Sequence, residues 1–252
     1  MKFLDSHAHI SSSDIKDPDS LVLRAKEKGV EEIINICTDI ATLQRGILLS
    51  KKWKGVFNTA ALTPHDVMKE EKGYFDLIAS YAHKKDLVAI GETGLDYYYK
   101  ELDPDRQKDS LIRHLKLAQD CGLPVIFHCR DAFQDLFEVC DQHYSGKALC
   151  HCFTGTKEEA EEVFKRGWML SFSGIVTFKK SEPLREVAKL APLHQIVIET
   201  DTPYLAPESK RGKVNEPSYI PEIAETIARA KNLSLEDAAK ATRDNALRFF
   251  NL

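Results

Sequence analysis

Two histidines one residue apart, His7 and His9, follow the first short apolar run of the chain, Phe3-Leu4. Because successive side chains of a strand point to opposite faces, residues i and i+2 share a face, and both imidazoles can reach one metal ion. Four further potential ligands each end or directly follow another apolar run. They are Glu92, His128, His151 and Asp201. An isolated buried histidine is usually a packing residue, but this recurrence favours a metal site with nitrogen and oxygen ligands.

The elements that would position these residues alternate along the chain. Apolar runs of strand length recur at residues 3–4, 32–36, 56–62, 87–90, 125–127, 148–149, 168–172 and 196–198. Segments with helical periodicity lie between them. Residues 105–120 form one such segment with Gly122 as a stop, and residues 156–167 form another, which begins with a capping box at Thr156.

Parallel strands need crossovers of a dozen or more residues, and this chain supplies them between successive strands. Eight such units predict an α/β fold closed into a TIM-type (β/α)8 barrel, with residues 1–252 as one domain and two helices after residue 221 packed against the barrel. An open doubly wound sheet is the alternative, but it would normally carry a glycine-rich phosphate loop, which this sequence lacks. In a closed barrel, the carboxyl ends of all strands surround one mouth, so the six potential ligands would meet there.

Composition narrows the class of protein. The 252 residues are 43% hydrophobic and 29% charged, with a formal net charge of −4, which argues against a broad basic nucleic-acid footprint but does not exclude phosphate substrates. Neither a signal peptide nor a membrane span is evident, so we expect a cytoplasmic protein without membrane association. The six cysteines form no CxxC pair and are expected to be reduced thiols. Strand alternation predicts that Cys150 and Cys152 point away from the side of His151.

Five motifs resemble those of the TatD family of metal-dependent hydrolases, in the amidohydrolase superfamily. The likeness runs from end to end and the motifs fall in the family's order: Asp5-Ser6-His7-Ala8-His9, Gly91-Glu92-Thr93-Gly94-Leu95-Asp96-Tyr97-Tyr98, Phe127-His128-Cys129-Arg130, His151-Cys152-Phe153-Thr154-Gly155 and Glu199-Thr200-Asp201-Thr202-Pro203-Tyr204-Leu205.

This resemblance implies a TIM-type barrel with two divalent metal ions at the mouth, namely Mg²⁺, Zn²⁺, Mn²⁺ or Ni²⁺. His7 and His9 would hold one ion, His128 and His151 the other, Glu92 would bridge them, and Asp201 would complete the site. The implied activity is a deoxyribonuclease that removes nucleotides from the 3′ end of DNA. Two nearby cations activate water and stabilise charge on the attacking and leaving oxygens. Asp201 and Glu92 are the expected catalytic residues, with Asp201 transferring the proton.

Substrate contacts are expected from residues that follow the third and eighth strands. The family's usual Gly-x-His-Pro-His segment reads Ala61-Leu62-Thr63-Pro64-His65 here, so one histidine is replaced by Thr63 and His65 remains. We expect His65, Arg211 and Asn215 to bind phosphate or sugar. A merely solvated loop is the alternative interpretation of the basic stretch 210–213.

Several neighbouring residues have two interpretations. Asp5 either orients a histidine or is a strand-end acid, and Asp96 is taken as structural. The tyrosines at 97–99 either stack on a base or pack against the protein, and packing is the commoner role of such a run. Gly91 and Gly94 predict a tight turn that leaves Glu92 facing the mouth.

The sequence therefore predicts a hydrolase whose partner is DNA, as single strands or 3′ ends, with no obligate protein partner. Amide or ester hydrolysis, including that of an aminoacyl-tRNA ester, is the alternative chemistry, because the ligands do not distinguish carbon from phosphorus. A metal-stabilised scaffold without turnover is a third possibility. The mixture of carboxylates and histidines argues against it, because structural zinc sites are usually closed and rich in sulfur.

Overall fold

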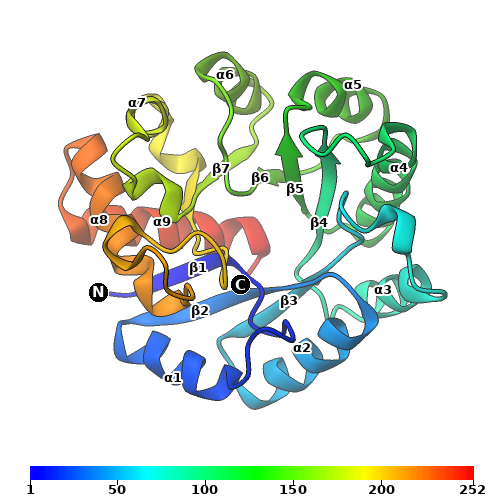
Figure 1. Ribbon diagram of the computed structural model, residues 1–252, viewed down its shortest axis with the longest axis horizontal. Coiled ribbons are helices and arrows are strands. Elements are labelled where there is room, and N and C mark those ends of the chain that lie inside the picture. The colour runs from blue at the N-terminus through cyan, green and yellow to red at the C-terminus, as the bar shows by residue number, and fades with distance from the viewer.

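Eight parallel strands form a ring in the computed structural model, which describes residues 1–252 (Figure 1). Each strand pairs in parallel with the next, in the order β1 to β8, so the predicted TIM-type barrel is confirmed. Each of the eight apolar runs of the sequence coincides with one of these strands or overlaps it. Their bounds are β1 Phe3–Ala8, β2 Val30–Cys37, β3 Val56–Ala60, β4 Ala89–Asp96, β5 Val125–Arg130, β6 Ala148–Cys150, β7 Met169–Phe172 and β8 Ile196–Ile198.

The ring closes between β1 and the segment that follows β8. There the Asp201 N–H donates to the His7 carbonyl at 2.9 Å, and the His9 N–H donates to the Thr202 carbonyl at 2.8 Å. Ala8 and Thr202 form a parallel bridge. This closure brings residues 7–9 and 201 together although almost the whole chain separates them.

Helices surround the ring on the outside (Figure 1). Their ends follow local signals in the sequence: Thr156 and Glu159 make the predicted capping box of α6, and Gly122 ends α4 in a left-handed conformation. The helices are α1 Pro18–Glu27, α2 Ile40–Lys52, α3 Tyr74–His83, α4 Pro104–Cys121, α5 Phe133–His143, α6 Lys157–Lys165, α7 Glu182–Leu190, α8 Ile220–Lys231 and α9 Leu235–Phe250, with short 3₁₀ turns η1 Val67–Lys69, η2 Gly174–Thr177, η3 Leu193–Gln195, η4 Glu208–Lys210 and η5 Pro217–Tyr219. None of these helices is long and apolar enough to cross a membrane.

The last helix, α9, covers the end of the barrel at which the strands begin. The Asn245 amide donates to the carbonyls of Leu193 and Ile196, both at 2.7 Å, beside the first residue of β8. Phe249 and Phe250 join an apolar cluster with residues from seven strands: Leu4, Ile34, Ile36, Ala89, Ile126, Leu149, Met169 and Val197. Apolar side chains thus fill this end of the barrel, and the mouth cavity lies at the opposite end.

Candidate metal centre

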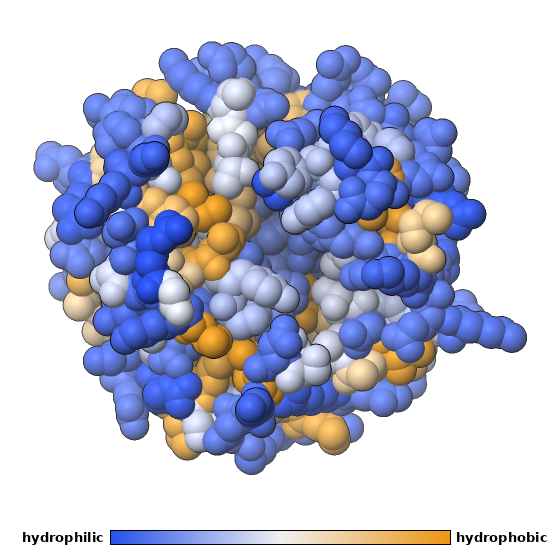
Figure 2. Space-filling model, in the orientation of Figure 1, coloured by the Kyte–Doolittle hydropathy of each residue, from blue (hydrophilic) through white to orange (hydrophobic).

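The six potential ligands of the sequence meet at the mouth of the barrel. His7, Glu92 and His128 lie on β1, β4 and β5, His9 and His151 directly follow β1 and β6, and Asp201 follows β8. We call these six residues the mouth cluster. All except the buried His7 line a cavity of about 960 Å³. Figure 2 shows this face hollowed near its centre, with mostly hydrophilic residues around the hollow.

Glu92 stands between two sets of imidazoles. Its Oε1 lies 2.9 Å from His128 Nδ1 and 3.0 Å from His151 Nε2. Its Oε2 lies 3.4 Å from His7 Nε2 and 3.6 Å from His9 Nε2. Each carboxylate oxygen therefore faces its own pair of histidines.

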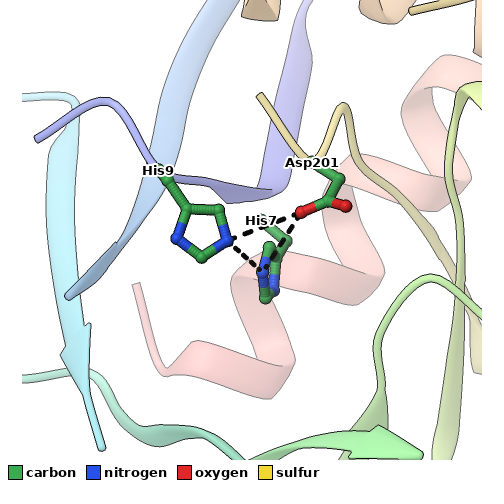
Figure 3. A group of neighbouring side chains, drawn as sticks. All are labelled: His7, His9 and Asp201. Atoms are coloured by element: carbon green, nitrogen blue, oxygen red, sulfur yellow. Dashed lines mark hydrogen bonds and ion pairs between the residues drawn. The ribbon is translucent and has the colours of Figure 1, made fainter. Parts of the chain in front are cut away.

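Asp201 adds an oxygen to the set that contains His7 and His9. Its Oδ1 lies 3.7 Å from His7 Nε2 and 3.5 Å from His9 Nε2, and these two nitrogens are 3.3 Å apart (Figure 3). The second carboxylate oxygen points away from both imidazoles in Figure 3. Asp201 has a φ of +60°, a conformation that non-glycine residues seldom adopt and that is concentrated at functional sites.

These separations fit ligand atoms that share a divalent cation. Ligands lie about 2.0–2.2 Å from zinc, so neighbouring ligand atoms are about 3–3.6 Å apart. Two neutral imidazoles that face each other through Nε2 can form at most one hydrogen bond between them, whereas a cation accepts both lone pairs. Two groups of the cluster have ligand atoms close enough to hold a metal: His7, His9 and Asp201, and His7, Glu92 and His151.

The electrostatics of the cluster keep its bridging carboxylate ionised. Burial alone would raise the pKa of Glu92, but the charge of His151 and hydrogen bonds with the surrounding imidazoles hold that pKa well below its usual range. Burial opposes the charged form of His151 as well, yet Glu92 and Glu199 raise its pKa well above the usual value. A buried anion thus lies among groups that favour its charge, as a metal ligand requires.

Two carboxylates that were not predicted as site residues contact the histidines on the side away from the cavity. Glu199 Oε1 lies 3.2 Å from His151 Nδ1. Asp96 Oδ2 lies 3.0 Å from His128 Nε2 and 2.9 Å from His65 Nε2, and these three residues form a third potential metal-binding group. A carboxylate on the far nitrogen of a ligating imidazole fixes its tautomer and orientation. Both positions had a signal in the sequence, since Asp96 lies four residues after Glu92 and Glu199 two before Asp201.

The path of β4 explains how Glu92 and Asp96 both reach the mouth. The prediction of a tight turn at Gly91 and Gly94 is wrong, because β4 continues to Asp96 with an irregular register between Ile90 and Thr93. Gly94 has a φ of +147°, and a β-carbon there would lie 1.9 Å from the His128 carbonyl oxygen. Only glycine permits this close approach of β4 to β5.

The three expected substrate contacts have different environments. His65 lines the mouth cavity, and its side chain is 37% exposed. Arg211 is exposed outside the cavity lining, with its guanidinium 4.5 Å from the Phe178 ring. The hydroxyl of Thr63 donates to Asp66 at 2.9 Å.

Asn215 was expected to face the mouth, but the structure buries it elsewhere. It is fully buried, and its amide donates to the carbonyls of Thr200 and Tyr204 at 2.7 and 2.6 Å. Its Oδ1 accepts the Glu216 N–H at 2.9 Å. All its polar atoms have partners within the loop, so Asn215 shapes the segment around Asp201 and has no group free for a substrate.

The structure also shows where Cys150, Cys152 and Asp5 point. Cys150 packs in the core, but Cys152 lines the mouth cavity, 3.2 Å from Ser173. Alternation does not extend to Cys152 because β6 ends at Cys150 and Cys152 has a φ of +43°. Asp5 contacts no imidazole nitrogen. It accepts hydrogen bonds from the Thr200 N–H and hydroxyl, at 2.9 and 2.5 Å, and so supports ring closure.

Comparison with known proteins agrees with this geometry. Residues 4–251 match the family model described as TatD related DNase. The uncharacterized metal-dependent hydrolase YabD of Bacillus subtilis is 35% identical, with 98% of each chain covered. The protein named 3'-5' ssDNA/RNA exonuclease TatD of Citrobacter rodentium is 32% identical, covering 96% of this chain and 95% of its own. The solved structure of YJJV, a TatD homologue from Escherichia coli, superposes with a TM-score of 0.93 at 25% identity, covering 99% of this chain and 98% of its own. The chain therefore belongs to the TatD family and is a metal-dependent hydrolase.

Proposed function

We propose that this hydrolase cleaves phosphodiester bonds with two divalent ions and removes nucleotides from the 3′ end of single-stranded DNA. The observation that carries the proposal is the position of Glu92, whose two carboxylate oxygens each face a separate pair of histidines. A carboxylate with this placement suits two ions that share one reaction centre. The name of the relative from Citrobacter rodentium, 3'-5' ssDNA/RNA exonuclease, supports the choice of substrate.

In this proposal, His7, His9 and Asp201 would hold one ion, His128 and His151 would hold the other, and Glu92 would contribute to both. Mg²⁺, Zn²⁺, Mn²⁺ and Ni²⁺ are the candidate ions, since sites of imidazole and carboxylate accept all of them. When bound, two such cations polarise the phosphodiester and lower the pKa of water. Neutral imidazoles leave most of the cationic charge uncancelled for an anionic substrate.

Asp201 transfers the proton in the proposed reaction. Its Oδ1 faces His7 and His9, while its second oxygen points away from them and forms no hydrogen bond. This oxygen accepts a proton from the attacking water as the new oxygen–phosphorus bond forms. It returns the proton to the 3′-oxygen of the preceding nucleotide when the old bond breaks. His65, which lines the same cavity, contacts the phosphate or the terminal sugar.

The decisive experiment follows hydrolysis of a 5′-labelled single-stranded oligonucleotide by the purified protein with each candidate ion. We expect a ladder that shortens from the 3′ end, loss of activity in excess EDTA, and no activity in Glu92→Gln. Glu27→Gln, an exposed change on α1, is the matched control and should act like the wild type. RNA, an aminoacyl ester and a small amide are tested in parallel. Hydrolysis of the amide or ester with no cleavage of either nucleic acid would reject the proposal.

A further inference from the structure

A free guanidinium faces the mouth cavity beside the proposed metal centre. Two arginines line this cavity. Arg45 donates to the carbonyls of Ser12 and Ile15, at 2.7 and 2.6 Å, and is thereby committed to holding the loop after β1. The Arg130 side chain forms no hydrogen bond or ion pair, so all its guanidinium N–H donors remain available. Because no lysine lines the cavity, Arg130 is the cationic side chain there that a phosphate can bind.

Two exposed tyrosines adjoin this arginine. The Arg130 guanidinium carbon lies 3.6 Å from the centroid of the Tyr98 ring and 5.8 Å from that of Tyr99. The two rings meet edge to face at 5.1 Å. Tyr98 is 53% exposed and Tyr99 is 41% exposed. Neither hydroxyl forms a hydrogen bond, whereas the neighbouring Tyr97 is partly buried and bonds to Asp135 at 2.7 Å. Tyr97 therefore packs against the protein, as is usual for such a run, whereas Tyr98 and Tyr99 remain exposed.

This group is continuous with the mouth cluster. Arg130 lies two residues after His128 on β5, so both side chains point to the same face of the strand. The Tyr99 ring meets the His65 ring edge to face at 5.6 Å, and His65 in turn meets His128 at 4.9 Å. A strand whose terminal phosphate lies at the mouth cluster can therefore place a neighbouring nucleotide against Arg130 and the tyrosines.

We propose that Arg130, Tyr98 and Tyr99 form a nucleotide subsite, in which Arg130 binds a phosphate that flanks the scissile bond and the tyrosine rings stack on an unpaired base. This inference rests on the proposed nuclease function and adds to it the way in which the strand is held. Base stacking on aromatic rings is tolerant of sequence but requires a base outside a duplex. The subsite accordingly selects single strands or frayed 3′ ends.

Binding, measured without turnover, tests the subsite separately from the proposed reaction. Fluorescence anisotropy in EDTA compares a labelled dT12 strand with the same strand carrying tetrahydrofuran abasic residues at its last three positions. Tyr99→Ala should weaken binding of dT12 about tenfold and leave binding of the abasic-ended strand unchanged. Tyr99→Phe should bind like the wild type. Arg130→Gln should weaken both strands about equally, because it removes a phosphate contact.

The control is Tyr81→Ala, which removes a tyrosine ring on α3 that lies beside Lys84. This variant should bind both strands like the wild type. Equal binding of dT12 by wild type, Tyr99→Ala and Arg130→Gln would overturn the subsite. So would an equal loss for both strands in Tyr99→Ala. Failure of the wild type to hydrolyse dT12 with any metal would reject the nuclease proposal instead, and the binding result would still decide the subsite. Thermal melts confirm that each variant is folded.

Discussion

At the scale of single residues, the central feature is the shared carboxylate of Glu92. A charged group that is 5% exposed is stable only when its environment compensates for lost hydration, and four imidazole nitrogens within 3.6 Å provide that compensation. The lone pairs of these closely spaced nitrogens and oxygens repel one another unless a cation or a proton lies between them. The site is therefore built for metal binding at a cost to the stability of the metal-free protein.

Asp201→Asn separates the proton-transfer role from the ligand role. Asparagine keeps an oxygen for the ion but cannot accept the proton, so we expect most of the bound metal to remain and kcat to fall by about 10²–10⁴-fold. Metal content by mass spectrometry and turnover on dT12 measure the two effects. Asp86→Asn, an exposed change, is the control. Near-normal turnover in Asp201→Asn would rule out the assigned role.

Asp96→Asn tests the support of His128 from behind. Burial would raise the pKa of Asp96, but hydrogen bonds with His128 and His65 hold it well below its usual range, so the group is a carboxylate at neutral pH. An amide in its place no longer fixes the imidazole tautomer. We expect metal affinity to fall about 10–100-fold, measured by calorimetry. An unchanged affinity would show that Asp96 has only a structural role, as the sequence had suggested.

At the scale of elements, α4 holds the far end of β4 in position. The Gln107 side chain accepts the Asp96 N–H at 2.8 Å and donates to the Asp96 carbonyl at 3.0 Å. About two turns further along the same helix, the buried His114 donates to the Ser110 carbonyl through Nδ1 at 2.7 Å and accepts the Leu62 N–H through Nε2 at 3.2 Å. This pattern requires the neutral imidazole and ties α4 to the segment after β3.

His114 should make the folded protein less stable as the pH decreases. Burial lowers its pKa to about 4 in the folded protein, from 6.5 in the unfolded chain. Between those values the unfolded chain binds a proton that the native state does not, so stability is retained above pH 6.5 and lost as pH falls towards 4. From pH 7 to pH 5, His114 should account for about 2 kcal/mol of the lost unfolding free energy.

Urea unfolding of His114→Gln in EDTA measures this contribution. The variant should lose less stability than the wild type between pH 7 and pH 5, whatever its stability at pH 7. His83→Gln, at an exposed histidine on α3, should follow the wild type. Identical pH dependence in His114→Gln and the wild type would contradict the assignment.

At the scale of the whole molecule, the mouth cluster joins parts of the barrel that are distant along the chain. Its ligands come from β1, β4 and β5 and from the segments after β1, β6 and β8. The opposite end is filled by α9, whose Phe249 and Phe250 pack on the strand interior. A bound cation would therefore link the strands at the end of the barrel that is not filled by the apolar side chains of α9.

Metal binding should raise the thermal stability of the whole barrel. An ion that binds only the native state at 100 times its Kd adds about 2.7 kcal/mol, which corresponds to a rise in Tm of roughly 5–10 °C for a chain of this size. Melting curves in EDTA and in Mn²⁺ or Zn²⁺ measure the shift. Glu92→Gln should reduce it sharply, and an equal shift in wild type and variant would place the ion elsewhere.

The sequence by itself determined the barrel and the convergence of the six ligands. Apolar runs of strand length separated by helical crossovers leave few alternatives to parallel pairing in chain order, and such pairing brings every strand's carboxyl end to one mouth. His7, Glu92 and Asp201 could therefore be placed together without knowledge of any contact between them.

Only the tertiary structure decided what surrounds these ligands. Beyond a strand end, side-chain direction depends on backbone angles that alternation does not describe, so Cys152 faces the mouth and Asn215 is buried in its own loop. Pairing between strands gave Asp96 its contact with His128, and it left Arg130, rather than Arg211, as the free cation beside the site. Those outcomes depend on contacts between residues far apart in the chain, whereas strand formation depends on local pattern, which is why the sequence alone could predict the ring of ligands but not their neighbours.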